Sequence, residues 1–173
     1  MKKLIGVGAG MIMAMALSAN GQAANNALAG KWTLQDADST QAKLDAAVEH
    51  VAQEMNFFIR ALARPVLKKQ TQICQQWLLD WQASQFQYQC DQAETATIPL
   101  TANGEVIKKD EEGVDISGIY RQTKDTVVVV LESERGTRTN TWQQVGENEL
   151  VFTVKLESEK LPTPLTWTLT YKR

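Results

Sequence analysis

The sequence predicts a mainly β fold: an antiparallel up-and-down barrel of about eight to ten strands, with a long helical segment inserted after the first strand. Two observations predict this fold class. The only long stretch with helical periodicity runs from about Ser39 to Gln70, and the chain from Ile73 onward consists of short segments separated by turn signals. A meander of this length exposes two unpaired edges unless it closes. We therefore expect the first strand to pair with the last.

The first 23 residues have the pattern of a secretory signal peptide. Lys2 and Lys3 precede an apolar run from Leu4 to Leu17, and small and polar residues follow it. The run is shorter than a typical membrane span, although a retained N-terminal anchor helix is the competing interpretation. We expect cleavage after Ala23, with Ala24 as the alternative, and a periplasmic location. No cysteine directly follows the run, so the sequence offers no site for a lipid anchor.

The remaining chain, residues 24–173, has the size of one domain that can bury its own core. It contains no second apolar run, no low-complexity tract and no linker rich in proline or glycine. Removal of Lys2 and Lys3 leaves 16 basic and 20 acidic residues, a net charge of −4. Because nucleic-acid-binding proteins usually carry a basic excess, we expect no nucleic-acid partner. We also expect no stable membrane span after cleavage.

The helical segment follows a predicted first strand at Leu28–Gln35. The run from Asp38 to Thr40 supplies helix-capping residues. Pro65 disfavours helical angles at Arg64 and suits the first position of a new helix, so we expect either one helix kinked there or a helix–turn–helix pair. Apolar residues at three- and four-residue steps define one helical face: Leu44, Val48, Val51, Met55, Phe58 and Leu62.

Nine further strands are expected, and tight turns join them into an antiparallel meander. The strongest turn signal is Asn103-Gly104, because both positions tolerate positive φ. The last two strands alternate cleanly between apolar and polar residues. The nine are about Ile73–Asp80, Gln85–Asp91, Thr95–Thr101, Glu105–Lys109, Val114–Gln122, Thr126–Ser133, Thr137–Val145, Leu150–Glu157 and Leu165–Lys172.

Cys74 and Cys90 are the only cysteines. An exported chain meets an oxidising environment, so we expect a disulfide between them. A hairpin turn at Trp81–Ala83 supports this pairing, because it sets Cys74 opposite Cys90 and Leu78 opposite Phe86. The competing interpretation, a redox pair, lacks the Cys-x-x-Cys spacing.

Several motifs resemble the calycin superfamily, which contains the lipocalins and the fatty-acid-binding proteins. Gly30-Lys31-Trp32 is similar to the Gly-x-Trp of the first lipocalin strand, and the ending Thr166–Arg173 resembles the last strand of fatty-acid-binding proteins. The order of elements is also similar to these proteins, whose two short helices form a lid. The resemblance implies that Arg173 packs over Trp32. The sequence departs from the carboxylate-binding Arg-x-Tyr motif at Leu169, so the resemblance indicates a fold and no particular ligand.

No catalytic motif stands out in the sequence. His50 is the only histidine, and the helical spacing puts it off the apolar face without a nucleophile or an orienting partner nearby. One histidine and two bridged cysteines do not make a nitrogen–sulfur set for zinc. We therefore expect a protein that is not an enzyme and that has no metal and no cofactor.

Arg60 and Arg64 are the best candidates for holding an anionic group. They lie one helical turn apart, so their guanidinium groups can converge on one carboxylate or phosphate. The alternative is that they pair with barrel carboxylates or cap strand carbonyls.

Four aromatic residues are candidates for the wall of an apolar pocket between helix and sheet. Phe57 and Phe58 belong to the helical segment, and Trp167 and Tyr171 belong to the last strand. Plain core packing is the alternative for all four.

Two functions remain open at this point. In the first, which we favour, the exported protein binds a small apolar or amphipathic ligand in a pocket between barrel and helix. In the second, the helix plugs the barrel, and the protein acts through its surface as an accessory factor or inhibitor of another envelope protein. A cavity of roughly a few hundred Å³ would favour the first function.

Overall fold

The structure is a computed structural model in which residues 27–173 are described. The expected signal peptide, residues 1–23, and both expected cleavage sites lie outside the described residues. The elements in chain order are β1 (Gly30–Leu34), α1 (Ala37–Gln53), α2 (Phe57–Gln70), β2 (Gln76–Gln82), β3 (Gln85–Cys90), β4 (Ala96–Pro99), β5 (Asn103–Lys109), β6 (Asp115–Gln122), β7 (Thr126–Ser133), β8 (Gly136–Gln144), β9 (Glu149–Glu157) and β10 (Leu165–Lys172).

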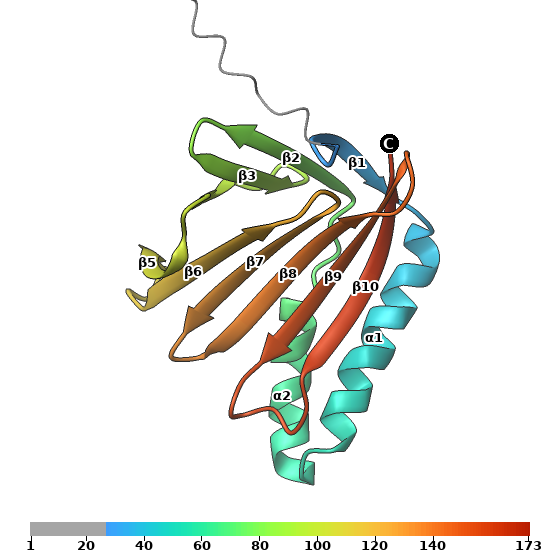
Figure 1. Cartoon of the computed structure of the whole chain (residues 1–173). Coiled ribbons are helices and arrows are strands. Elements are labelled where there is room, and N and C mark those ends of the chain that lie inside the picture. The colour runs from blue at the N-terminus through green and yellow to red at the C-terminus, as the bar shows by residue number, and fades with distance from the viewer. Residues whose placement is uncertain (1–26) are drawn as a thin grey trace, which may run out of the picture.

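The ten antiparallel strands form one sheet that curls into a nearly closed barrel (Figure 1). The strand order is β4-β3-β2-β1-β10-β9-β8-β7-β6-β5. The first strand pairs with the last, with Thr33 opposite Lys172 and Leu34 opposite Tyr171. The predicted fold class and this pairing are both confirmed. The sheet ends at β4 and β5, which are consecutive in the chain and leave a seam between them.

Side-chain packing brings the two edges of this seam together. Ile98 of β4 and Ile107 of β5 meet above Gly118 of β6. A Cβ atom at position 118 would lie 3.1 Å from Cδ1 of Ile98 and 2.7 Å from Cδ1 of Ile107. The backbone N–H of Tyr120 also donates a hydrogen bond to the carbonyl of Ala102, at 2.9 Å. Gly118 therefore allows the two edges to approach each other over β6.

The alternating residues of β6 to β10 form rows of side chains that face the barrel interior. One row crosses five strands through Gly118, Leu131, Arg138, Leu156 and Leu165. The next row crosses the same strands through Tyr120, Val129, Asn140, Val154 and Trp167. A third row crosses four strands through Val127, Trp142, Phe152 and Leu169. Arg138, in the first row, lies close to the β7–β8 turn. Trp142 and Phe152, in the third row, lie further from that turn.

Aromatic rings fill the interior at the level of the third row. The ring centroids of Trp77 and Phe152 lie 4.9 Å apart, and those of Trp142 lie 5.1 Å from both Tyr88 and Phe152. Phe86 packs on the other side of Trp142 at 5.6 Å. These rings fill this end of the interior.

Trp32 and Arg173 lock the closure between β1 and β10. The guanidinium carbon of Arg173 lies 4.0 Å from the centroid of the buried Trp32 ring. This distance is typical of a cation–π contact. The indole N–H of Trp32 donates to the carbonyl of Leu28 at 2.9 Å. The packing of Arg173 over Trp32 that the resemblance implied is confirmed.

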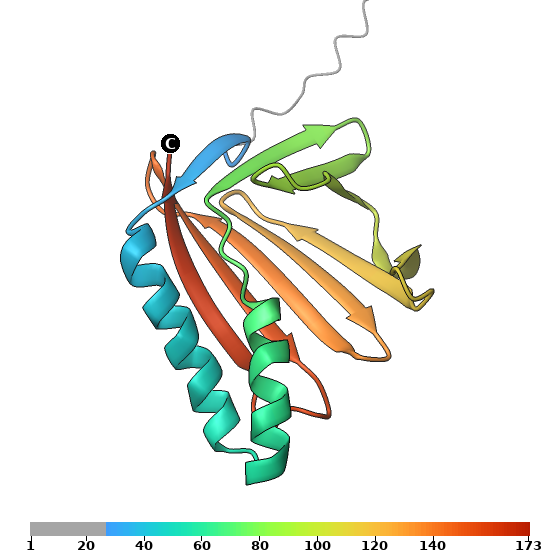
Figure 2. The same ribbon diagram turned by 180° about the vertical axis from the view of Figure 1, so that it is seen from behind.

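The two helices follow β1 and form a helix–turn–helix pair, one of the two expected forms. α1 lies against β10, and α2 returns beside α1 (Figures 1 and 2). The break falls at residues 54–56, so the expectation of a break at Pro65 was wrong. Asn56 starts the second helix because its side chain accepts a hydrogen bond from the N–H of Ile59 at 3.0 Å. Pro65 is exposed within α2 and forgoes only one backbone hydrogen bond.

The predicted apolar face holds for the first helix only. Its three members in α1, Leu44, Val48 and Val51, are buried, and so is Met55 in the break. Phe58 and Leu62 are exposed instead, so their placement on the same buried face was wrong. The turn at residues 54–56 reverses the chain, and the helical phase of α1 therefore does not continue into α2.

The register of the β2–β3 hairpin also differs from the expectation. Trp77 lies opposite Cys90 and Trp81 opposite Phe86, so the predicted pairing of Leu78 with Phe86 is off by three residues. An odd slip exchanges the two faces of a strand. The observed register buries Trp77 and Leu79 and leaves Leu78 exposed. The larger apolar side chains of β2 thereby enter the core.

Candidate ligand-binding site

A cavity of about 540 Å³ lies between α2 and the ends of strands β6 to β9 that are lowest in Figure 1. We call it the mouth cavity. Its volume falls in the range of about 300–1,000 Å³ that is typical of small-molecule sites. Its apolar lining comes from Val66, Leu67, Ile116, Leu131, Leu156 and Leu161.

Arg138 is a charged residue of the inward-facing row beside the mouth cavity. It lines the cavity and belongs to the row of Leu131 and Leu156. Its Nε donates a hydrogen bond to Oδ1 of Asn140 at 3.0 Å, and Asn140 is itself buried. Within residues 27–173, no carboxylate lies at ion-pair distance from Arg138, and its Nη1 and Nη2 have no hydrogen-bond partner. The interior of the barrel thus holds a positive charge that no acidic side chain compensates.

Burial affects the electrostatics of this guanidinium and its neighbour. Desolvation lowers the pKa of Arg138, and the nearby Tyr88 hydroxyl partly offsets this effect. Burial also raises the pKa of Tyr88, against the smaller opposing effect of Arg138. The two shifts show that both groups sit in a medium of low polarity. An anion near Arg138 would be attracted more strongly there than at the surface.

Trp167 lies beside this charge, one row further in. The guanidinium carbon of Arg138 is 5.8 Å from the centroid of the Trp167 ring. The indole N–H of Trp167 is buried and has no acceptor in the described part of the chain. Arg138 and Trp167 therefore both carry donors that the protein leaves unused near the mouth cavity.

Two charged residues on the rim of the mouth cavity, Arg135 and Glu157, have ionic partners. Arg135 contacts Oδ2 of Asp110 at 3.2 Å, and Glu157 contacts Nζ of Lys155 at 2.6 Å. These exposed pairs compensate one another in solvent. Arg138 differs from them in both burial and lack of a counter-ion.

Arg60 and Arg64 do not converge on one site in the structure. The Arg60 side chain donates to the carbonyls at the end of α1, with bonds of 3.1 Å to Ala52 and 2.7 Å to Gln53. Arg64 makes a two-point contact with Glu49 of α1, at 2.9 and 2.6 Å. Both side chains therefore join the two helices. The alternative considered above was pairing with barrel carboxylates or strand carbonyls, and the observed partners belong to α1 instead.

The four aromatic candidates are not brought together either. Phe57 and Phe58 lie in the first turn of α2 and are exposed. Trp167 and Tyr171 are buried in the barrel, and the Tyr171 hydroxyl donates to the carbonyl of Cys74 at 2.9 Å. None of the four lines the mouth cavity.

Arg138 was not among the residues expected to bind a ligand. The signal that could have found it is the alternation of β8, where Arg138, Asn140 and Trp142 alternate with outward-facing threonines. An arginine in the same phase as a core tryptophan points into the barrel.

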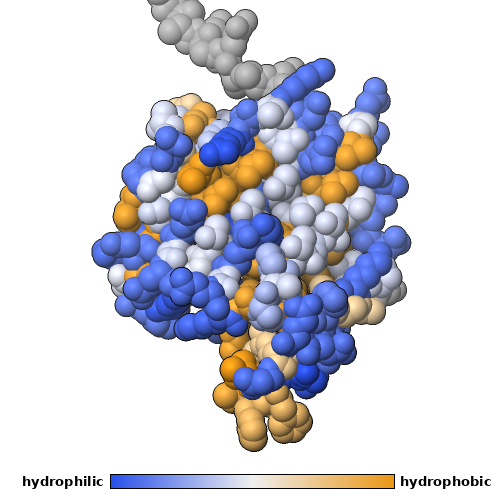
Figure 3. Space-filling model, turned by 60° about the horizontal axis from the view of Figure 1, so that its bottom comes forward, coloured by the Kyte–Doolittle hydropathy of each residue, from blue (hydrophilic) through white to orange (hydrophobic). Residues whose placement is uncertain are grey.

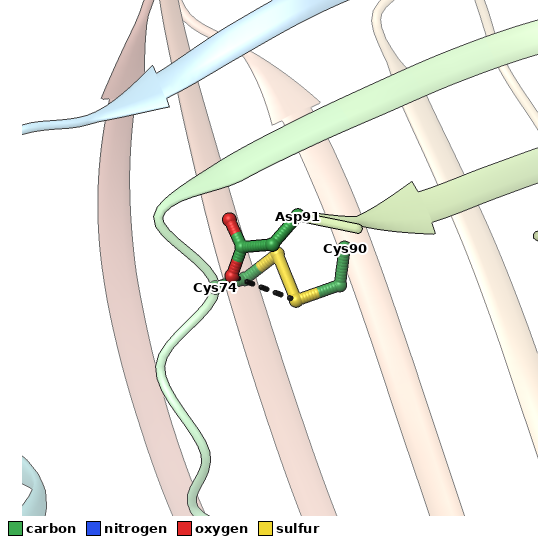
Figure 4. Close-up of side chains that lie close together, drawn as sticks. All are labelled: Cys74, Cys90 and Asp91. Atoms are coloured by element: carbon green, nitrogen blue, oxygen red, sulfur yellow. Dashed lines mark hydrogen bonds between the residues drawn. A yellow bond between two sulfur atoms is a disulfide. The ribbon is translucent and has the colours of Figure 1, made fainter. Parts of the chain in front are cut away.

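The expected disulfide joins Cys74 to Cys90, with the two Cα atoms 5.4 Å apart. Asp91 completes a compact cluster with it (Figure 4). The Asp91 carboxylate accepts hydrogen bonds from the backbone N–H groups of Gln75 and Gln76, at 3.2 and 2.8 Å. The two sulfur atoms form a covalent bond with each other, and the carboxylate is hydrogen-bonded to the backbone. The cluster therefore fastens the start of β2 to the end of β3.

Within residues 27–173, neither α1 nor α2 has the length and apolar character that crossing a bilayer requires.

Comparison with solved structures supports the fold. The chain is similar to a secretory abundant heat soluble protein from Ramazzottius varieornatus, with 14% identity, a TM-score of 0.52, and coverage of 86% of this chain and 96% of the other. It is also similar to fatty-acid-binding protein 1 of Echinococcus granulosus, with 13% identity, a TM-score of 0.50, and coverage of 85% and 97%. No protein-family model and no curated protein sequence matches the chain.

The chain thus has the fold of a calycin-like barrel, and the resemblance to this superfamily is confirmed at the level of fold. The helix pair occupies the position after the first strand, as predicted. At identities of 13–14%, the comparison concerns the fold alone.

Proposed function

We propose that this protein is an exported, non-enzymatic binding protein that holds a small amphipathic molecule in the mouth cavity. The apolar part of the molecule lies among the leucine side chains, and its anionic group lies against Arg138. The observation that carries the proposal is the half-buried guanidinium of Arg138 on the wall of a cavity, for which residues 27–173 supply no counter-ion.

The energetics of burial support an anionic group at this position. A buried charge is costly unless it is paired and hydrogen-bonded. Arg138 has one hydrogen bond to Asn140 and two free terminal nitrogens. A carboxylate or a similar planar anion matches the forked geometry of these nitrogens. A ligand would thus supply the partner that the protein lacks.

Two other observations support the proposal. The Echinococcus granulosus neighbour is named a fatty-acid-binding protein, and a fatty acid is a small amphipathic molecule of the kind proposed here. Export to the periplasm is supported by the signal-peptide pattern of residues 1–23 and by the disulfide, since disulfides persist in oxidising compartments.

The proposal is tested with two probes of equal chain length, dodecanoate and 1-dodecanol, titrated into purified residues 24–173. The wild type is expected to bind dodecanoate more tightly than the alcohol by about tenfold or more, because charge-assisted hydrogen bonds contribute about 1.5–3 kcal/mol. Arg138→Gln is expected to abolish this preference. Arg121→Gln is the matched control, because Arg121 is an exposed strand arginine of β6.

Two results would contradict the proposal. One is that neither probe binds to the wild type. The other is that Arg138→Gln keeps the preference for dodecanoate while its circular dichroism spectrum remains native. Native mass spectrometry of protein purified from the cell envelope would then show whether a different molecule copurifies.

A further inference from the structure

The second helix presents an apolar surface to solvent. α2 buries only Leu67, whereas Phe57, Phe58 and Leu62 are exposed to 76%, 80% and 75%. We define the α2 apolar face as Phe57, Phe58, Ile59, Leu62 and Val66, all of which are exposed. The turn before α2 projects beyond the ends of the strands, and apolar residues gather on this projecting part (Figures 1 and 3). Exposed apolar patches commonly mark interaction surfaces.

Specific contacts hold this face outward. Arg60 binds the carbonyls at the end of α1, Arg64 binds Glu49, and Nζ of Lys68 lies 3.0 Å from Oδ1 of Asp45. These contacts fix the rotation of α2 about its own axis. The apolar stripe of α1 is already buried against the barrel. The apolar residues of α2 are therefore not needed to cover it.

The charge of α2 differs from that of the rest of the protein. The helix contains four basic residues and no acidic residue, while the whole chain has a net charge of −2. Two of the four, Lys68 and Lys69, lie in its last turn and are exposed. Lys69 follows Val66 by three residues and therefore borders the apolar face. A helix with basic residues beside an exposed apolar face is typical of one that lies on a membrane surface.

We propose that the α2 apolar face docks on an anionic lipid surface, with Phe57, Phe58 and Leu62 inserted at the level of the headgroups and Lys69 beside lipid phosphates. A lipid surface fits better than a second copy of the chain. A stable protein–protein interface uses about 20–30 residues on each side, whereas this face consists of five residues on a projecting helix. The proposal goes beyond ligand binding and does not depend on it.

The test is flotation of residues 24–173 with vesicles of phosphatidylglycerol and phosphatidylcholine, compared with phosphatidylcholine alone. Wild type is expected to float with the anionic vesicles and to lose most of this binding in the neutral ones or at high salt. The variant Phe58→Gln/Leu62→Gln is expected to bind at least about tenfold more weakly, because it removes two large apolar side chains. The matched control is Leu78→Gln/Val106→Gln, which removes two exposed apolar residues of the barrel, 46% and 54% exposed.

Three results would overturn the proposal. The first is wild-type protein that does not float with either vesicle. The second is an equal loss of flotation in both double variants, which would show that α2 contributes no more to vesicle binding than the barrel surface does. The third is a wild-type dimer in sedimentation that Phe58→Gln/Leu62→Gln converts to a monomer, without vesicle binding. Thermal melting of each variant establishes that it is folded, and Lys69→Gln, which leaves the apolar face intact, provides a second variant with an expected loss restricted to anionic vesicles.

Discussion

Tyr171 ties the last strand to the segment that precedes β2. Its ring is fully buried near Phe152, with the two centroids 6.4 Å apart. Its hydroxyl donates to the carbonyl of Cys74, which lies outside the regular sheet. Burial raises the pKa of Tyr171 far above its usual value, so the hydroxyl stays protonated and remains a donor. This residue therefore serves the fold, in the position where a pocket wall was expected.

Replacement of Tyr171 by phenylalanine is expected to lower the free energy of unfolding by about 1–3 kcal/mol, since it leaves the Cys74 carbonyl without its donor. Urea denaturation followed by tryptophan fluorescence measures this change. The matched control is Tyr88→Phe, because the Tyr88 hydroxyl makes no hydrogen bond within residues 27–173. A loss in Tyr171→Phe no greater than that in the control would contradict the assigned role.

At this scale the sequence identified types of residue better than their partners. The prediction that Arg173 covers Trp32 is confirmed, because Trp32 lies on β1 and Arg173 directly follows β10, and the sequence pattern already required these two strands to pair. The partners of Arg60 depend on where α1 ends, and the helical pattern alone did not contain that information. The sequence shows that residue 138 is an arginine. It does not show that the neighbouring inward positions on β7 and β9 are leucines, because that depends on how the strands pair.

Polar contacts of Arg60, Arg64 and Lys68 join α2 to α1. Arg64 lowers the pKa of Glu49 below its ordinary value of 4.5 through their hydrogen bonds, which outweigh the opposite effect of desolvation. The pKa of Arg64 is raised by the same contact. A carboxyl whose pKa is lower in the folded state stabilises that state at pH values above 4.5, and this contribution is lost as the pH falls through the folded-state pKa.

Acid is therefore expected to loosen α2 in the wild type. Amide hydrogen exchange of α2, compared between wild type and Glu49→Gln at the same pH, measures local opening. At pH 7 the wild type is expected to be better protected, and the difference is expected to disappear at acid pH, once the pH has fallen through the folded-state pKa of Glu49, which lies below 4.5. An equal difference at both pH values would show that Glu49 acts through its packing and not through its charge.

Elements as such were largely predictable, while the joints between them were not. All ten strands occur close to their expected ranges because alternation and turn residues mark them locally. The break between the helices was misplaced because Asn56, a cap, had more influence than Pro65. The β2–β3 register was misplaced because both turn positions were compatible with local sequence, and only burial of Trp77 in the closed barrel distinguishes them.

The whole molecule combines a rigid, ring-filled end with an open end that carries the mouth cavity. The disulfide and Asp91 fasten the ring-filled end, where β2 begins and β3 finishes. The seam between β4 and β5 closes through Gly118. The cavity lies away from the disulfide, whereas Gly118 belongs to the same row as the cavity-lining Leu131 and Arg138. The disulfide and the proposed ligand site therefore depend on different parts of the barrel.

Removal of the disulfide is expected to lower stability without removing the fold. The bridge closes a loop with a sequence separation of 16, so Cys74→Ser/Cys90→Ser should lose about 3 kcal/mol of unfolding free energy in the chain-entropy model. Equilibrium denaturation of oxidised wild type and the double variant measures this loss. Thiol labelling of the wild type without reductant should find no free cysteine, and two reactive thiols would contradict the bridge.

The pairing of β1 with β10 also has a consequence for the order of folding. The two strands lie at opposite ends of the described chain, so their contact closes the longest loop in the sheet and is among the slowest to form. Each strand from β6 to β9 pairs only with the strands directly before and after it in the chain, so these pairings close short loops. During synthesis β10 is the last of the ten described strands to leave the ribosome. Until it does, β1 and β9 each lack a hydrogen-bonding neighbour, and the sheet remains an unsealed ribbon.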